Sequence, residues 1–227
     1  IAQVAEKIIF QNGFSERITV IHKKSTDLVV GVDLTKKVDL VISEILSSEF
    51  VGEGVIPTML DVNRRLLNEN GKMIPESGDI RVALLRNSVK AREDNLVGDM
   101  YGYDLSEYNK ITQTKSSNIL KEDPSFISSI EVAFSFNFYD AVTLIEQEKV
   151  LEIEVLESCT CLGLITWLRL NLYDDISFEN KPSELGSGWI NPIYLFEKPL
   201  PVSAGQRIKV KATLKRDFVW FEFIELV

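Results

Sequence analysis

The carboxyl-terminal two-thirds of the chain is a succession of β-type segments, and this pattern constrains the fold more than any other feature. Seven runs rich in β-branched and aromatic residues follow Gly78. No helical period of comparable length lies between them. The runs span residues 80–85, 129–136, 150–156, 162–172, 190–196, 206–214 and 218–226. Such a series predicts an all-β unit over residues 79–227, either a barrel or a sandwich.

The first 78 residues have a different pattern, in which helical and extended segments alternate. Apolar residues at three- and four-residue spacing predict a helix that ends at Asn12-Gly13. Strands are predicted over 17–22, 38–43 and 72–74. A second helix is predicted over 56–67, and Asn70-Gly71 is expected to close it. This order is typical of the second half of a doubly wound, Rossmann-like α/β sheet. The predicted fold is therefore partial α/β over 1–78, followed by a β-barrel.

Residues 87–123 interrupt the β-rich part with a polar segment that has few strand signals. The segment contains Tyr101-Gly102-Tyr103-Asp104. Irregular insertions of this length in compact domains are usually functional or disordered. We therefore expect an arm-like insertion in the barrel.

Composition and charge narrow the classes of function. Hydrophobic residues make up 45% and charged residues 26% of the 227 residues, as in ordinary globular proteins. A net charge of −9 argues against nucleic acid as the main ligand and is compatible with a basic peptide or with simple solubility. Apolar runs such as 161–165 are too short to span a bilayer. We expect a cytoplasmic protein, with a nuclear location left open.

Metal-binding patterns are weak. The only histidine is His22, expected at a strand end, and the only cysteines, Cys159 and Cys161, are separated by one residue. This spacing matches no common zinc pattern and is too short for an ordinary disulfide staple. We expect free thiols on a buried strand and no metal site.

The most informative short segment spans residues 43–54, directly after the predicted buried strand 38–42. It contains Glu44, Glu49 and Glu53, and the last of these lies between two glycines. In one interpretation the acids cap the next helix or face water. In the other, Glu44 and Glu53 converge on one cation when the intervening chain folds back as a hairpin. A guanidinium suits such a pair, because its fixed fork of N–H donors forms charge-assisted hydrogen bonds with carboxylates.

Several separated segments resemble the protein arginine methyltransferase family over essentially the whole chain. The segment from Ser43-Glu44 to Glu53 resembles the family's double-glutamate loop, and Gly52-Glu53-Gly54 is closest to the branch that makes only monomethylarginine. Lys24-Ser25-Thr26-Asp27 is similar to the loop that meets the cofactor's adenine ring. Tyr101-Gly102-Tyr103-Asp104 resembles the start of a dimerisation arm, and Ser187-Gly188-Trp189 falls where the family has Thr-His-Trp.

The resemblance implies methyl transfer from S-adenosylmethionine to a guanidinium nitrogen of an arginine-containing protein or peptide. It implies Glu44 and Glu53 as catalytic residues, and Ser25, Thr26 and Glu44 as cofactor-binding residues. Glu49 and Trp189 are expected to bind substrate, although a solvated acid and a core tryptophan are equally simple explanations. A homodimer through 87–123 is expected, without membrane or direct nucleic-acid binding.

Two departures from the family pattern keep other functions open. Gly188 replaces the central histidine of the Thr-His-Trp loop, which removes an orienting contact to the glutamate loop. In the resemblance, the glycine-rich cofactor motif and the ribose-binding acid precede the segment that matches Ile1, so we expect the chain alone to be inactive. The alternatives are a non-catalytic relative that binds or regulates a partner, and a hydrolase that uses Glu44 and Glu53 as acid and base.

Overall fold

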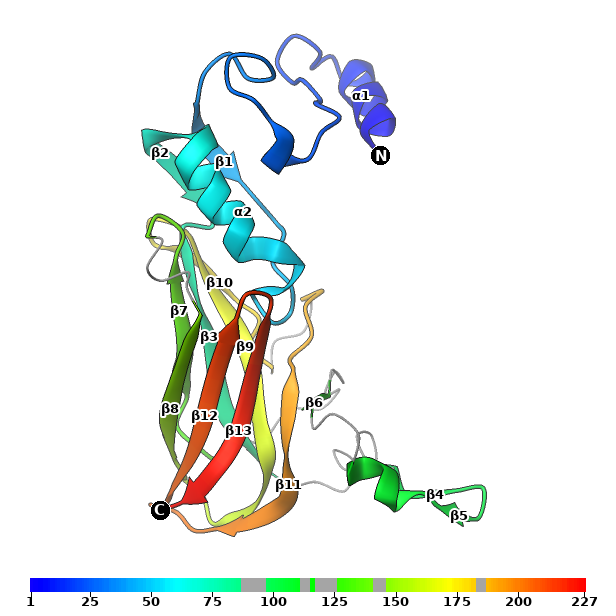
Figure 1. Ribbon diagram of the computed structural model, residues 1–227, viewed down its shortest axis with the longest axis vertical. Helices are drawn as coiled ribbons and strands as arrows, with labels where there is room; N and C mark the ends of the chain where they lie inside the picture. Colours follow the sequence, from blue (N-terminus) through cyan, green and yellow to red (C-terminus); the bar gives the residue numbers. More distant parts are fainter. Residues whose placement is uncertain (87–96, 111–114, 117–125, 141–145, 183–186) are drawn as a thin grey trace.

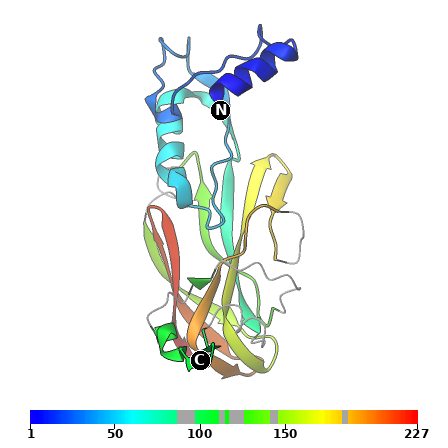
Figure 2. The same ribbon diagram turned by 90° about the vertical axis from the view of Figure 1, so that its right-hand side faces the viewer.

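The computed structural model describes residues 1–86, 97–110, 115–116, 126–140, 146–182 and 187–227. Two parts follow one another along the long axis (Figures 1 and 2): an amino-terminal α/β part and a β-rich part that carries the carboxyl terminus. The predicted boundary at residue 78 falls inside the first long strand of the β-rich part. No described helix is both long enough and apolar enough to cross a membrane.

The larger sheet of the β-rich part has six strands. Its order is β6-β11-β9-β3-β7, and β10 pairs with β9 outside this path. All these pairs are antiparallel. The strands are β3 (Ser77–Arg86), β6 (Lys115–Ser116), β7 (Glu131–Asn137), β9 (Cys159–Tyr173), β10 (Ile176–Glu179) and β11 (Ile193–Val202).

Strand β9 is covered on both faces, which explains its nearly continuous apolar sequence. Leu164 and Leu168 belong to the main core, whereas Ile165 and Trp167 belong to a second cluster on the opposite face. Cys161 is buried on this strand and burial raises the pKa of its thiol to about 12, so it is an unreactive core side chain. Both cysteines are free, as predicted.

A second sheet of three strands closes the core on its other side. Its antiparallel order is β13-β12-β8. The two sheets contact each other at both edges, where β7 lies beside β8 and β11 beside β13. The strands are β8 (Gln147–Glu154), β12 (Arg207–Lys215) and β13 (Phe218–Leu226). The described residues after Gly78 thus lie mainly in strands with a barrel-like arrangement, consistent with the predicted β-rich pattern.

The amino-terminal part is built around one βαβ unit. Strand β1 (Val38–Ile42) pairs in parallel with β2 (Leu67–Ile74), and the connection between them contains the helical segments. These are η2 (Gly52–Gly54), α2 (Val55–Asp61) and the π-helical η3 (Val62–Leu66); farther upstream lie α1 (Ala2–Gln11) and η1 (Ser25–Asp27). The predicted helices 1–11 and 56–67 are confirmed.

Four local predictions for this part are wrong. Residues 17–22 form no strand. Their β-branched side chains favour an extended backbone, but no described strand lies beside them to form the hydrogen bonds of a sheet. His22 is therefore not at a strand end; its Nε2 lies 3.1 Å from Glu6 Oε1. Strand β1 is not buried, since Ile42 is 71% exposed. Asn70-Gly71 does not close the helix, which ends earlier, and lies inside β2.

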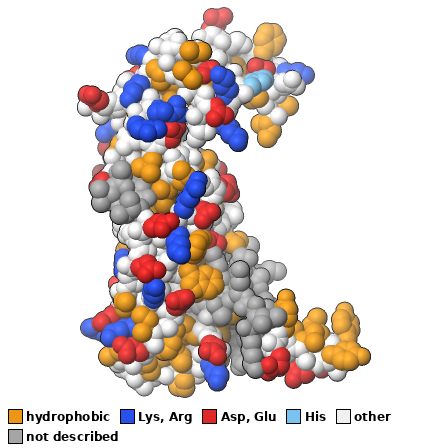
Figure 3. Space-filling view, viewed as in Figure 1, with side chains coloured by type: hydrophobic (Ala, Val, Ile, Leu, Met, Phe, Trp, Pro, Cys, Tyr) orange, Lys and Arg blue, Asp and Glu red, His pale blue; other side chains and the backbone are white. Residues whose placement is uncertain are grey.

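The predicted arm lies partly outside the described residues. Its described portion contains the short hairpin β4 (Asp99–Met100) and β5 (Tyr103–Asp104), followed by η4 (Ser106–Lys110). The hairpin projects beside the barrel, and apolar side chains gather on it in the space-filling view (Figure 3). Tyr101 is 96% and Tyr103 72% exposed. The arm over 87–123 stays a prediction, because residues 87–96, 111–114 and 117–123 lie outside the described part of the chain.

Candidate active site

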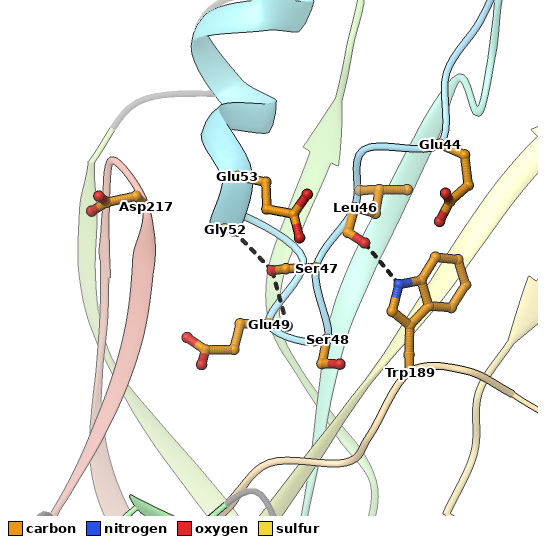
Figure 4. Close-up of a pocket in the computed structure, with 9 residues that line it drawn as sticks. All are labelled: Glu44, Leu46, Ser47, Ser48, Glu49, Gly52, Glu53, Trp189 and Asp217. Atoms are coloured by element: carbon orange, nitrogen blue, oxygen red, sulfur yellow. Dashed lines mark hydrogen bonds between the residues drawn. The ribbon is translucent and has the colours of Figure 1, made fainter. Parts of the chain in front are cut away.

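A cavity of about 480 Å³ lies where the loop after β1 meets the end of the barrel (Figure 4). The loop, residues 43–54, supplies most of its lining. Trp189 contributes from the segment before β11, and Asp217 from the turn between β12 and β13. The lining residues are Glu44, Leu46, Ser47, Ser48, Glu49, Gly52, Glu53, Trp189 and Asp217. Segments far apart in sequence therefore build one site at the junction of the two parts.

The loop folds back on itself as a tight turn held by the side chain of Ser47. The Ser47 Oγ accepts hydrogen bonds from the backbone N–H groups of Gly52 at 3.0 Å and Glu49 at 3.3 Å (Figure 4). The N–H of Phe50 donates to the carbonyl oxygen of Ser47 at 2.8 Å. These contacts return the chain so that Glu53 shares the cavity with Glu44. The loop thus folds back, as the second interpretation of the sequence requires.

The turn requires unusual backbone angles at three of its positions. Phe50, Glu53 and Gly54 have φ values of 71°, 61° and 74°. Positive φ is disfavoured for residues that carry a Cβ atom, above all for a bulky one, and costs about 1–3 kcal/mol where it occurs. Glycine at position 54 avoids this cost. Phe50 and Glu53 do not, so packing elsewhere must hold them in place.

Packing of the Phe50 side chain supplies that restraint. Its ring is fully buried and stacks on Phe136 of β7, with ring centroids 4.3 Å apart and an interplanar angle of 16°. Phe138 stacks on it from 6.0 Å. Gly78 of β3 makes room, since a Cβ there would lie 2.6 Å from the Phe50 ring. One aromatic side chain, that of Phe50, therefore anchors the loop by packing into the barrel core.

A second link joins the loop to the segment before β11. The indole Nε1 of Trp189 donates to the carbonyl oxygen of Leu46 at 2.7 Å. The backbone N–H of Ile190 donates to Ser48 Oγ at 3.0 Å. The Trp189 ring is only partly buried and packs edge-on against Phe178, with centroids 5.5 Å apart. Trp189 therefore forms a wall of the cavity and also positions the loop that carries the acids.

The predicted acids are exposed to the cavity in different ways. In Figure 4 the carboxylates of Glu44 and Glu53 lean toward the middle from opposite ends, whereas the Glu49 carboxylate points toward the turn that carries Asp217. Glu44 and Glu53 are exposed, and neither has an ion pair or side-chain hydrogen bond with another described residue. Glu49 is partly buried and has an interaction of its own. Glu44 and Glu53 are thus the carboxylates open to a ligand.

Electrostatics favour a cationic ligand. Four carboxylates line the cavity, and no described lining residue is a lysine, arginine or histidine. The pKa of the nearby Tyr194 is raised, mainly because its side chain is buried and to a lesser degree because Glu49 is negatively charged. The Tyr194 hydroxyl accordingly remains protonated and donates to the carbonyl oxygen of Val219 at 3.0 Å. An acidic, partly apolar cavity of this kind suits a planar cation such as a guanidinium.

The structure brings together only some of the predicted site residues. Glu44, Glu49, Glu53 and Trp189 line the cavity, whereas Ser25 and Thr26 lie on η1 and do not line it. Sequence reasoning missed Ser47, Ser48 and Asp217. Ser47 and Ser48 lie inside the loop that was singled out, so its serine pair was an available signal. Asp217 gave no such signal, because an aspartate in a turn between two strands is usually an ordinary solvent-exposed residue.

Comparison with family models found no match. Comparison with curated proteins found similar sequences. An arginine N(omega)-methyltransferase of Streptomyces achromogenes subsp. streptozoticus is 28% identical over 214 residues, which cover 93% of this chain and 58% of that protein. Protein arginine N-methyltransferase 7 of Oryza sativa subsp. indica is 41% identical over 73 residues, 32% of this chain and 10% of that protein. The chain thus spans less than two-thirds of the length of these relatives.

Two solved structures share the fold. A chain of the Trypanosoma brucei PRMT1 enzyme-prozyme heterotetrameric complex with AdoHcy has a TM-score of 0.82 at 16% identity, over 99% of this chain and 78% of that one. Arabidopsis thaliana protein arginine methyltransferase 10 has a TM-score of 0.75 at 18% identity, over 99% and 80%. The chain is thus similar in sequence to proteins named arginine N-methyltransferases, and it shares its fold with the two solved structures.

Proposed function

We propose that the chain forms the substrate-binding part of a protein arginine N-methyltransferase, which transfers a methyl group from S-adenosylmethionine to a guanidinium nitrogen of an arginine in a protein. The observation that carries the proposal is the cavity shared by Glu44 and Glu53, with two further carboxylates and no cationic lining residue among those described. The sequence relatives named as arginine methyltransferases support the same activity.

The roles of Glu44 and Glu53 follow from the chemistry of the guanidinium. This group stays protonated at ordinary pH, so an enzyme does not have to remove a proton before binding it. Paired carboxylates would hold two of its nitrogens and draw the positive charge toward them, which leaves the third nitrogen a better nucleophile. The same pair stabilises the cationic product, and the released proton passes to a glutamate or to water. Positioning of this type contributes several powers of ten in rate.

S-adenosylmethionine supplies an activated methyl group when it is bound, and the residues expected to hold it are Ser25, Thr26 and Glu44. The local structure fits a nucleoside. Ser25 and Thr26 expose their hydroxyl groups on η1, and Val29 just beyond them is 49% exposed. Hydroxyls beside an exposed apolar side chain match a ligand that combines a flat base with polar edges. Glu44 follows the end of β1 and lines the cavity.

The remaining lining residues are assigned to the peptide that carries the arginine. Trp189 walls the cavity on the barrel side, and Glu49 attracts basic residues near the target arginine. The hairpin with exposed Tyr101 and Tyr103 suits a homodimer contact through 87–123, since apolar surface of this kind favours burial against a partner. A reducing cytoplasmic compartment accords with the two free cysteines.

A methylation assay on the full-length protein tests the proposal. Glu44→Gln and Glu53→Gln each preserve size but remove the charge, so each should lower the turnover of an arginine-rich peptide by about 100-fold or more. The circular dichroism spectrum and melting temperature should not change, because both side chains are exposed. Glu222→Gln on β13, an exposed acid outside the cavity lining, is the control. Full turnover in both active-site variants would exclude the proposed roles.

A regulatory relative without activity is the second candidate, and Gly188 favours it. The glycine is exposed and offers no side chain to the neighbouring glutamate loop. Cofactor and peptide binding without turnover on any arginine peptide would support this candidate over the enzyme.

A further inference from the structure

The Arg65 side chain connects two segments that the proposed function uses separately. Its Nη1 donates to the carbonyl oxygen of Leu28 at 2.6 Å. Its Nη2 donates to the carbonyl oxygens of Thr26 at 3.0 Å and Ser25 at 3.3 Å. One guanidinium thus binds three backbone carbonyls of residues 25–28, a segment named here the 25–28 loop.

Asp61 holds the Nε–Nη2 edge of the same guanidinium, so that Nη2 is shared between Asp61 and the loop. Arg65 Nε donates to Asp61 Oδ1 and Nη2 to Asp61 Oδ2, each at 2.5 Å. Because the Arg65 guanidinium donates these hydrogen bonds, the pKa of the Asp61 carboxyl is lowered, and that of Arg65 is raised by the same contact. The pair is bidentate, which fixes the plane of the guanidinium as well as its position. Lysine offers no such fork, so only arginine can satisfy the carboxylate and three carbonyls together.

The arrangement leaves the loop's side chains available. The hydrogen bonds from Arg65 to this loop go to backbone carbonyl oxygens, and Ser25, Thr26 and Asp27 stay exposed. None of the loop's residues is fully buried. Leu28 packs against the main core, and the local backbone bonds are Asp27 N to Lys24 O at 2.9 Å and Leu28 N to Ser25 O at 3.2 Å. Arg65 supplies the side-chain hydrogen bonds that hold the carbonyl groups of Ser25, Thr26 and Leu28.

The helix that carries Arg65 begins at the glutamate loop. Gly54, next to Glu53, is the N-cap of α2, and Arg65 follows about three turns later in η3. The buried side chains Val55 and Met59 pack this helix into the main core. One well-packed helix therefore carries Glu53 before its first turn and the anchor of the 25–28 loop in its last.

We propose that Arg65 is a positioning residue that holds the 25–28 loop in its cofactor-binding conformation, in register with the glutamate loop. The inference rests on the proposed function, in which Ser25 and Thr26 contact the cofactor. Arg65 itself touches neither the cofactor nor the substrate. Losing it should weaken cofactor binding selectively, because α2 and the cavity are held by core packing that does not involve Arg65.

The test compares Arg65→Gln, Arg65→Lys and Arg64→Gln in the full-length protein. Arg64 is the matched control, because its side chain is 79% exposed and its Nη2 lies 4.0 Å from Asp61 Oδ1, beyond hydrogen-bond distance. Amide hydrogen exchange without ligand reports on the loop through the N–H groups of Asp27 and Leu28. Calorimetry with AdoHcy and with an arginine-rich peptide separates the two binding sites.

We expect Arg65→Gln to reduce the protection of the Asp27 and Leu28 amides about tenfold and to raise the Kd for AdoHcy at least fivefold. The Kd for the peptide should stay within twofold. Arg65→Lys should fall between wild type and Arg65→Gln, and Arg64→Gln should match wild type.

Three results would overturn the inference. A loosened loop with unchanged AdoHcy affinity would leave Arg65 a purely structural residue, and so would equal losses for AdoHcy and peptide. Unchanged amide protection in Arg65→Gln would show that the loop does not depend on this contact. Wild-type protein that binds no AdoHcy, although Arg65→Gln still loosens the loop, would instead disprove the proposed function and the cofactor role of Arg65 with it.

Discussion

The barrel and the amino-terminal region, residues 1–45, are stabilised by different forces. No residue before Leu46 is buried, and α1 exposes Phe10 at 76%. The barrel strands instead enclose a continuous apolar core that also takes in Phe50 and one face of α2. Residues 1–45 add only partly buried side chains to this core, Leu28 and Val30 among them, and polar contacts such as the 2.6 Å pair of Lys23 and Asp33. The candidate site thus has a wall fixed by full burial and a neighbouring segment fixed by partial packing and a few hydrogen bonds.

This difference bears directly on the site. The proposed guanidinium site lies on the packed wall, where Phe50 and Trp189 fix the glutamate loop. The proposed cofactor loop lies in the polar region and depends on Arg65. Peptide binding should therefore respond to changes in the barrel core, whereas cofactor binding should respond to single polar substitutions.

Replacement of one phenylalanine in each region gives the largest expected contrast. Phe50→Ala should lower the free energy of unfolding by about 3–5 kcal/mol, because it removes a fully buried ring that restrains a strained turn. Phe10→Ala should change it by less than about 0.5 kcal/mol. Denaturant unfolding of both variants measures the difference. Equal losses would mean that α1 is packed as firmly as the barrel.

Two glycines give a smaller contrast within the barrel part itself. A Cβ at Gly163 of β9 would lie 2.1 Å from the carbonyl oxygen of Tyr194, whereas a Cβ at Gly188 meets nothing within 4 Å. Gly163→Ala should therefore cost about 1–3 kcal/mol through overpacking. Gly188→Ala should be close to neutral. If Gly188→Ala were as destabilising in thermal melts, the loop before β11 would be packed more tightly than described here.

Acid should loosen the amino-terminal region in a narrow range of pH. The pKa of Asp61 is held below its ordinary value of 3.8, chiefly by hydrogen bonds from Arg65, and Lys23 lowers that of Asp33 in the same way. A lowered carboxyl pKa contributes stability above the unfolded value, and this stability is lost as pH falls through the folded value.

Protection factors of the Asp27 and Leu28 amides should accordingly stay constant from pH 7 to about pH 4.5 and fall only below about pH 4. The barrel amide of Ile208, in the β12–β8 ladder, should keep its protection over the same range. Asp61→Asn should show low loop protection at every pH. A loss between pH 6 and 5 would point to a group other than these aspartates.

The sequence predicted the barrel better than the site, for a physical reason. Alternation and apolar runs are local, so the strands around Ile80, Leu164 and Val210 could be located without knowing their partners. Strand pairing is not local: residues 17–22 have strand propensity but no described partner. The pair Glu44 and Glu53 was suggested by spacing and by family resemblance.

The contacts that shape the site gave weaker signals. Asp217 reaches the cavity from a distant hairpin, and Arg65 acts on backbone carbonyls, which no side-chain pattern reveals. The positive φ of Phe50 depends on a pocket formed by β3 and β7, so it too follows from tertiary packing. These features require the folded chain because each joins residues without a common sequence motif.

The central claim is that Glu44 and Glu53 hold one and the same cation. A double-mutant cycle tests it most directly, using the Kd of an arginine-rich peptide for wild type, Glu44→Gln, Glu53→Gln and the double variant, measured by calorimetry. If both carboxylates bind one guanidinium, the effects should be non-additive, with a coupling of at least about 1 kcal/mol. Additive losses, within about 0.3 kcal/mol, would mean that the two acids act on separate groups and would contradict the account.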